Sequence, residues 1–221
     1  MGGINVNHNP PIVFGVPRSG STLMFNIMDR LFEDVGGVDS QIHYFVKKNM
    51  ATVNYELAVN EYLSTIKLSN KKIIATYRDF RNVIISYHKL YDTRIQPITV
   101  SSLFISRIKQ SLECLRILKE NIPENEILFL RYENFFNNFD YIFDKLEDFY
   151  DYKFSSEKKR WIAKRFDIKN GNKNLTKLLK GASKSNHGHI TAEGKTNWQT
   201  SSMKYMDGEI EKHLKLWGYK I

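Results

Sequence analysis

Short apolar runs alternate with longer stretches of helical periodicity along this chain. Buried strands are predicted at residues 12–16, 73–77 and 127–130, with a shorter strand within residues 38–46. After the first run, apolar residues at helical spacing predict a helix ending near Leu31, and further helical patterns cover residues 50–66, 97–119, 137–166 and 205–216. This alternation predicts a three-layer α/β fold with a mainly parallel sheet, helices on both faces, and a ligand outside the carboxyl ends of the strands.

The first strand leads into a loop, residues 17–22, with the composition of an anion-binding turn. Backbone N–H groups at a helix start have no intrahelical partner and lie at the positive end of the helix dipole. Gly20 allows the backbone to approach an anion closely, and Arg18 offers a fork of donors suited to phosphate or sulfate oxygens. Hydroxyl donors come from Ser19, Ser21 and Thr22. The segment predicts a phosphate-binding loop, and an ordinary turn between strand and helix is the alternative.

This loop lacks the lysine of a nucleotide triphosphatase loop. Gly15 and Gly20 match the pattern G-x-x-x-x-G-K-[ST], and Thr22 matches its last position. Ser21, however, stands where the pattern requires lysine, and the cation is at Arg18 instead. An ATP kinase uses that lysine to bridge its terminal phosphates, so a P-loop kinase of a small molecule is the less favoured interpretation.

A second phosphate motif follows the strand at 73–77. Arg78 comes directly after this strand, and Ser86 lies eight residues later on the helix predicted there. Together with the sequence Pro-Arg-Ser-Gly-Ser-Thr at 17–22, this motif resembles the sulfotransferase family that uses 3'-phosphoadenosine 5'-phosphosulfate (PAPS). The resemblance implies that the first loop holds the 5'-phosphosulfate and that Arg78 and Ser86 hold the 3'-phosphate. The alternative is a solvated helix start at Arg78 and Arg81, with Ser86 as a surface residue.

The strand within residues 38–46 is expected to end near a candidate catalytic base, His43. Sulfuryl transfer to an alcohol needs a base that removes the acceptor proton, and neutral histidine suits that role near pH 7. Cytosolic sulfotransferases have a Lys-Thr-His triplet at such a strand end, whereas Gln41 stands in the lysine position here. The resemblance implies His43 as the base and Arg18 as the group that stabilises charge on the leaving oxygen. Glu56 is the alternative base, and a structural role is the alternative for His43.

Two later segments extend the resemblance. The sequence Arg-Tyr-Glu-Asn-Phe after the last strand is similar to a sulfotransferase motif, which implies that Tyr132 lies beside the adenine and that Glu133 braces neighbouring loops. A tyrosine packed in the core is the alternative, and a helix is expected to open two residues after Tyr132. Residues 167–200 are polar and predict a mobile loop or lid. The lid sequence Glu-Gly-Lys-Thr-Asn-Trp resembles the carboxyl motif of the family, so Gly194 and Lys195 are expected at the 3'-phosphate.

Composition and charge are consistent with such an enzyme. The chain has 221 residues and 42% hydrophobic content, so a single domain over residues 1–221 is expected, with a tail at 1–10. The net charge of +9 suits a polyanionic donor such as PAPS. Because the charge is spread along the chain, nucleic acid is not expected as a partner. A noncatalytic basic module that binds nucleic acid or another polyanion is the second alternative to a sulfotransferase.

The single cysteine and the first residues favour a soluble cytoplasmic protein. Cys114 is the single cysteine of the sequence, so an internal disulfide is excluded, and its position in a helical pattern predicts that it lies in the core. The chain shows no signal-peptide pattern and no apolar run long enough to span a bilayer, so no membrane partner is expected. His187 and His189 have no accompanying cysteine or carboxylate cluster, and no metal is assigned. A small molecule or glycan is expected as acceptor, and its identity and the oligomeric state stay open.

Overall fold

The structure, a computed structural model, describes residues 11–35, 37–38, 40–42, 64, 71–91, 102–167 and 207–220. Within these ranges, four parallel strands form a sheet in the order β2-β1-β3-β4. The strands are β1 (Ile12–Gly15), β2 (Ser40–Ile42), β3 (Ile73–Tyr77) and β4 (Ile127–Arg131). Gly15 is in register with Thr76, and Tyr77 is in register with Arg131, so β1, β3 and β4 end along one edge of the sheet.

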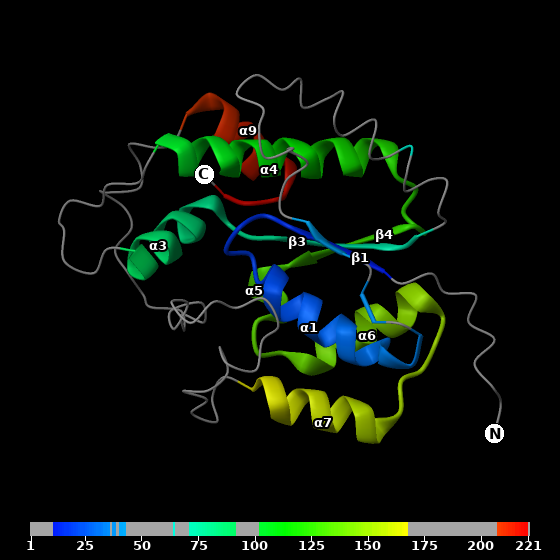
Figure 1. Ribbon diagram of the computed structural model, residues 1–221. Helices are drawn as coiled ribbons and strands as arrows, with labels where there is room; N and C mark the ends of the chain where they lie inside the picture. Colours follow the sequence, from blue (N-terminus) through cyan, green and yellow to red (C-terminus); the bar gives the residue numbers. More distant parts are fainter. Residues whose placement is uncertain are drawn as a thin grey trace.

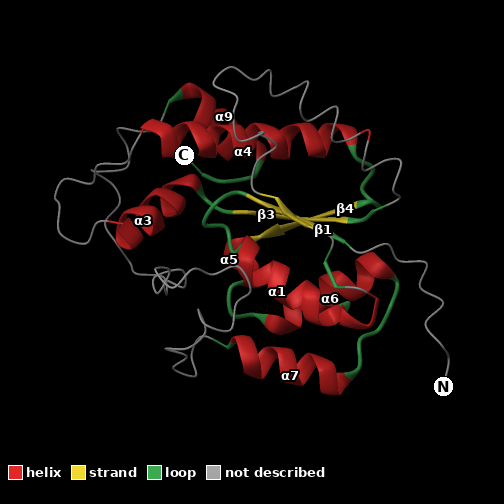
Figure 2. Cartoon of the chain, in the orientation of Figure 1, coloured by secondary structure: helices red, strands yellow, loops and turns green. Residues whose placement is uncertain are grey.

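Helices cover both faces of this sheet (Figures 1 and 2). One face carries α4 (Ser102–Asn121) and α9 (Gly208–Leu216), and the first turns of α3 (Phe80–Tyr91) pack into the same core. The other face carries α1 (Ser21–Leu31), α5 (Tyr132–Phe135) and α6 (Phe139–Tyr150), and α7 (Ser156–Phe166) packs against α1. The predicted three-layer α/β fold is confirmed.

Side chains along the strands alternate between two cores. Ile12 and Phe14 of β1 belong to the core on the α4 side, whereas Val13 belongs to the core on the α1 side. In β3, Ile73 and Ile74 divide in the same way. Parallel strands that are buried on both faces appear in a sequence as continuous apolar runs. This burial explains why the strands were visible in the sequence.

Polar caps and one left-handed residue determine where the helices begin and end. The side chains of Asn138, Ser155 and Asp207 each accept a backbone hydrogen bond at the start of α6, α7 and α9, respectively. Asp151, with φ of 50°, ends α6. The helical stretch predicted at residues 137–166 is therefore two helices, because the chain leaves the helical conformation at Asp151.

Several other helix predictions can be compared with the structure. The helix expected to open near Asn134 begins at Tyr132, directly after β4. Gly218 follows α9 with φ of 72°, as expected for the residue that ends that helix. Cys114 is buried in α4, as predicted. Apart from Ser64, the helix predicted at 50–66 lies outside the described residues.

Within the described ranges, no helix combines the length and apolar character needed to cross a bilayer.

Candidate functional site

The phosphate motifs of the sequence meet at the carboxyl edge of the sheet. The loop after β1 leads into α1, Arg78 follows β3, and Tyr132 follows β4. Because β3 lies between β1 and β4, these three strand ends are neighbours (Figure 1). In open α/β sheets, ligands bind in the crevice outside such strand ends.

The loop between β1 and α1 has a turned backbone that is tied to β3. Arg18 and Gly20 have φ of 69° and 80°, in the left-handed region. The Ser19 hydroxyl is buried and hydrogen-bonds to the backbone oxygen of Thr76 at 3.1 Å and to its hydroxyl at 2.8 Å, while Ser19 N–H donates to Val16 O at 3.0 Å. Ser19 therefore supports the loop from inside, and a direct contact between its hydroxyl and a ligand stays a prediction.

The start of α1 faces this edge of the sheet without a capping side chain. Gly20 is the N-cap of α1, and no side chain caps the helix by a hydrogen bond. The first turn contains no acidic residue, and it includes Ser21, which is buried, and Thr22, which is partly exposed. A helix start of this kind favours an anion through its N–H groups and its dipole.

Arg18 contacts both Ser86 and Arg78. Arg18 donates to Ser86 Oγ through Nε at 3.0 Å and through Nη2 at 2.8 Å. Arg78 Nη1 donates to the backbone carbonyl of Arg18 at 3.2 Å. The structure thus brings together three residues that the resemblance had assigned to two different phosphate groups. Two guanidinium groups and a hydroxyl gathered at one edge suit an anion with several oxygens.

Arg78 is a buried cation with one donor unused. Its relative exposure is 8%, and its Nε has no hydrogen-bond partner among the described residues. The adjacent Asp79 is engaged by Arg81, which donates from Nε at 2.8 Å, from Nη2 at 2.5 Å and from its backbone N–H at 2.9 Å. These bonds to Asp79 raise the pKa of Arg81. A buried charged donor without a partner is costly, so this site favours binding of an anion at Arg78.

The ring of Tyr132 packs against both Arg78 and Gly20 of the phosphate loop. The guanidinium carbon of Arg78 lies 4.1 Å from the centroid of the Tyr132 ring, a cation–π contact. Tyr132 is buried, and its ring packs against Phe135 and Phe136. A Cβ atom added to Gly20 would lie 2.8 Å from Tyr132 Cδ2, so this close approach requires glycine. The contact of Tyr132 with an adenine stays a prediction.

Glu133 braces the strand ends, as the resemblance implied. Its Oε1 accepts the backbone N–H of Asp79 at 3.1 Å. Its Oε2 accepts the hydroxyl of Tyr219 at 3.0 Å and lies 3.4 Å from Arg131 Nε. The loop that holds Arg78 is therefore linked to β4 and to the segment after α9.

Several predicted site residues lie outside the described residues. They are His43, Glu56, Gly194 and Lys195, together with the tail at 1–10 and the lid beyond Asp167. β2 ends at Ile42, the residue before His43, and Ile42 is in register with Phe14 of β1. In the described part of the chain, no group of three or more His, Cys, Asp or Glu side chains could hold a metal ion. Chemistry without a metal stays a prediction.

Two residues that support the site were not predicted from the sequence. Thr76 anchors Ser19, and its signal was a hydroxyl inside an otherwise apolar strand. Tyr219 anchors Glu133, and its signal was an aromatic residue directly after the glycine that ends the last helix. Neither signal identifies the partner residue, because the partners lie far away along the chain.

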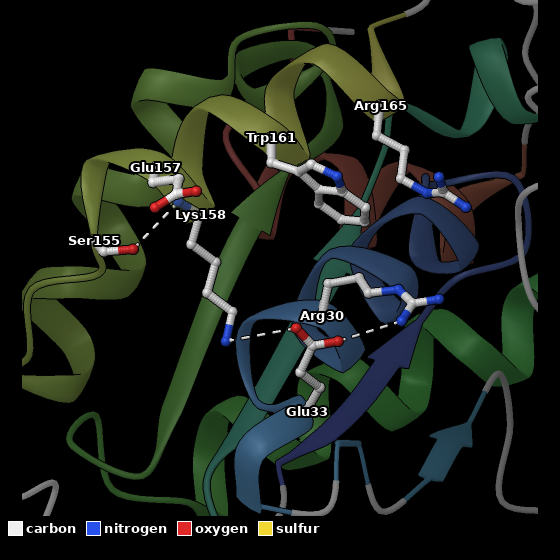
Figure 3. A pocket seen from close by; sticks show the side chains of 7 residues that line it. All are labelled: Arg30, Glu33, Ser155, Glu157, Lys158, Trp161 and Arg165. Carbon is white, nitrogen blue, oxygen red and sulfur yellow. Dashed lines mark hydrogen bonds and ion pairs between the residues drawn. The ribbon is translucent and has the colours of Figure 1, made fainter.

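A separate cavity of about 510 Å³ lies between the second half of α1 and α7 (Figure 3). It is lined by Arg30, Glu33, Ser155, Glu157, Lys158, Trp161 and Arg165. Glu33 pairs with Arg30 at 3.3 Å and with Lys158 at 3.9 Å, so these charges already have partners. Arg30 is nine residues beyond the start of α1, about 14 Å along the helix from the phosphate loop. This cavity is therefore not part of the candidate site.

Comparison with known proteins supports the fold assignment. No protein-family model matches the chain, and no curated protein is matched by its sequence. Among solved structures, mouse sulfotransferase SULT7A1 complexed with PAP is similar, with a TM-score of 0.58 and 14% identity over 94% of this chain and 82% of that chain.

Two sulfotransferase domains are also similar, each with a TM-score of 0.49 and 13% identity. One, from the curacin biosynthetic pathway, matches 97% of this chain and 100% of that chain. The other, from the olefin synthase of Synechococcus PCC 7002, matches 97% of this chain and 96% of that chain. The likeness to the mouse enzyme shows that the chain has the sulfotransferase fold, so the predicted resemblance is confirmed at the level of the fold.

Proposed function

We propose that this protein is a sulfotransferase that moves a sulfuryl group from PAPS to a hydroxyl or amine of a small-molecule or glycan acceptor. The observation that carries the proposal is Arg78, a buried guanidinium whose Nε has no hydrogen-bond partner among the described residues and whose Nη1 donates to the carbonyl of Arg18 in the phosphate loop. The fold of a sulfotransferase whose structure contains PAP, the desulfated form of PAPS, supports the same proposal.

Different residues bind the 5'-phosphosulfate and the 3'-phosphate of the nucleotide. Arg18 and three backbone N–H groups bind the 5'-phosphosulfate: that of the N-cap Gly20 and those of Ser21 and Thr22 in the first turn of α1. Arg78 and Ser86 bind the 3'-phosphate, together with Gly194 and Lys195 from the predicted lid. ATP and AMP have no 3'-phosphate, so either would leave the buried Arg78 donor unpaired. This cost would make the site selective for the bisphosphorylated nucleotide.

The proposed chemistry depends on positioning and on charge stabilisation. PAPS supplies the sulfuryl group, and Arg18 with the loop N–H groups stabilises the charge that develops on the bridging oxygen as the bond to sulfur breaks. His43 accepts the proton of the acceptor as the new bond to sulfur forms, with Glu56 as the alternative base. In-line transfer of this kind requires alignment of donor and acceptor more than covalent help from the protein.

Calorimetric titration of the purified chain with PAP, AMP and ATP tests the nucleotide site. We expect micromolar binding of PAP, with AMP and ATP about tenfold weaker or more, because only PAP satisfies Arg78. Tighter binding of ATP would support the kinase alternative. Binding of heparin or RNA without any preference for PAP would support the noncatalytic polyanion-binding module instead.

The assignment of the base is tested by variants of His43 and Glu56. An acceptor screen that follows PAP release from PAPS identifies a substrate first. With that substrate, His43→Ala should lower kcat by about 100-fold or more while the Kd for PAP stays unchanged, because the base acts on the acceptor proton. Glu56→Ala serves as the comparison. If it lowers kcat and His43→Ala does not, Glu56 is the base.

A further inference from the structure

We propose that Tyr219, after the last helix, is a positioning residue that holds Arg78 in place for the 3'-phosphate of the donor. This inference rests on the proposed function, since it concerns how the same nucleotide site is kept in shape. Tyr219 itself touches no reacting atom. It acts through Glu133 on the peptide that follows Arg78.

The connection consists of two hydrogen bonds to one carboxylate. The Tyr219 hydroxyl donates to Glu133 Oε2 at 3.0 Å, and the backbone N–H of Asp79 donates to Glu133 Oε1 at 3.1 Å. Asp79 is the residue after Arg78, so its N–H belongs to the peptide group through which the chain leaves Arg78. Fixing this peptide limits the directions from which the Arg78 side chain can approach a ligand.

Tyr219 is itself held firmly at the end of α9. Gly218 has φ of 72°, and Tyr219 N–H donates to Leu214 O at 2.9 Å, a Schellman-type helix end. The Tyr219 ring lies 4.0 Å below the guanidinium carbon of Arg131 and meets the Tyr77 ring edge-on at 6.2 Å. Tyr77 is the residue before Arg78, so Tyr219 restrains the chain on both sides of this arginine.

Burial and the negative charge of Glu133 keep the Tyr219 hydroxyl protonated, so it donates the hydrogen bond. Burial raises the pKa of Tyr219, and the carboxylate of Glu133 raises it further, so the phenol keeps its proton at neutral pH. Arg131, 3.4 Å from Glu133 Oε2, balances the negative charge of Glu133. A charged acceptor makes the hydrogen bond from Tyr219 stronger than one between neutral groups.

Loss of this hydrogen bond should affect only ligands that reach Arg78. The guanidinium of Arg78 lies over the Tyr132 ring and donates to Arg18 O. This arrangement depends on the position of the peptide group that follows Arg78. PAP and AMP share the adenine, the ribose and the 5'-phosphate, and only PAP has the 3'-phosphate. The ratio of their affinities therefore reports on Arg78 and separates positioning from general folding.

The test compares Tyr219→Phe with Tyr152→Phe. Tyr152 is partly buried against the core on the α1 side, where its ring packs against Phe154. Its variant removes the same hydroxyl from a residue that is not among the hydrogen-bond partners of Glu133 in the described structure. For Tyr219→Phe we expect PAP to bind about five- to thirty-fold more weakly, with the Kd of AMP, measured by displacement titration, unchanged. For Tyr152→Phe both constants should match those of the wild type.

Thermal unfolding of both variants checks that each protein is folded. Equal weakening of PAP and AMP by Tyr219→Phe, or no change in either, overturns the positioning role of Tyr219. If the wild-type chain itself shows no preference for PAP over AMP, the proposed function fails first, and the inference that rests on it fails as well.

Discussion

Replacing Arg78 with alanine is expected to weaken PAP binding by about 100-fold or more, the largest effect on nucleotide affinity predicted for a single side chain of this site. The guanidinium is buried at 8% exposure and its Nε has no partner among the described residues, so a bound phosphate would be its main ionic contact. Each hydrogen bond from a charged group is worth about 1.5 to 3 kcal/mol, and Arg78 has two or more to offer. Calorimetric titration of the variant with PAP measures the loss.

Two matched variants separate charge, geometry and position in this experiment. Arg78→Lys keeps the positive charge but not the planar fork of donors, so it should fall between the wild type and Arg78→Ala. Arg165→Ala removes a guanidinium from the cavity between α1 and α7 and should leave PAP binding unchanged. If Arg165→Ala weakens PAP binding and Arg78→Ala does not, the nucleotide lies in that cavity, and the proposed site is wrong.

AMP provides the internal control for Arg78→Ala. AMP has no 3'-phosphate, so its affinity for the variant should stay within about threefold of the wild-type value. A parallel loss of AMP affinity would mean that Arg78 maintains the phosphate loop through its bond to the Arg18 carbonyl instead of binding the ligand. The two outcomes assign different roles to the same side chain.

The strands and the order of the loops were predictable because local signals suffice for them. β3 was predicted at residues 73–77 and is observed at Ile73–Tyr77, and β4 extends one residue beyond its predicted end, to Arg131. Strands buried on both faces give uninterrupted apolar runs. The glycine, hydroxyl and arginine residues after β1 identify an anion-binding turn by composition alone.

The side-chain partners were not predictable from local signals. Ser19 hydrogen-bonds to Thr76, and Arg18 to Ser86, over 57 and 68 residues of sequence, respectively. The first pair depends on the register of β1 and β3, and the second on where α3 leaves the sheet. The break at Asp151 was missed for another reason: the aromatic periodicity continues across it, and aspartate is a weaker signal than glycine for a left-handed residue.

Substituting Gly20 by alanine is expected to lower the free energy of unfolding by about 2 to 4 kcal/mol, measured by urea denaturation. Two costs combine at this position. The φ of 80° is unfavourable for any residue with a Cβ atom, and the new Cβ would lie 2.8 Å from Tyr132 Cδ2 and 2.9 Å from Phe135 Cζ. Both rings are buried, so neither can move away freely.

Gly218→Ala measures the backbone part of this cost, so the difference between the two variants gives the steric part. Gly218 has a similar φ of 72°, but a Cβ atom added there would meet no atom of the described structure within 4 Å. Its variant should therefore lose only the backbone contribution, about 1 kcal/mol. Equal losses at the two glycines would show that the rings of Tyr132 and Phe135 give way. A larger loss at Gly20 would mean that glycine is needed there because the rings of Tyr132 and Phe135 pack closely against the phosphate loop. The packing of the core would then determine the shape of the anion site.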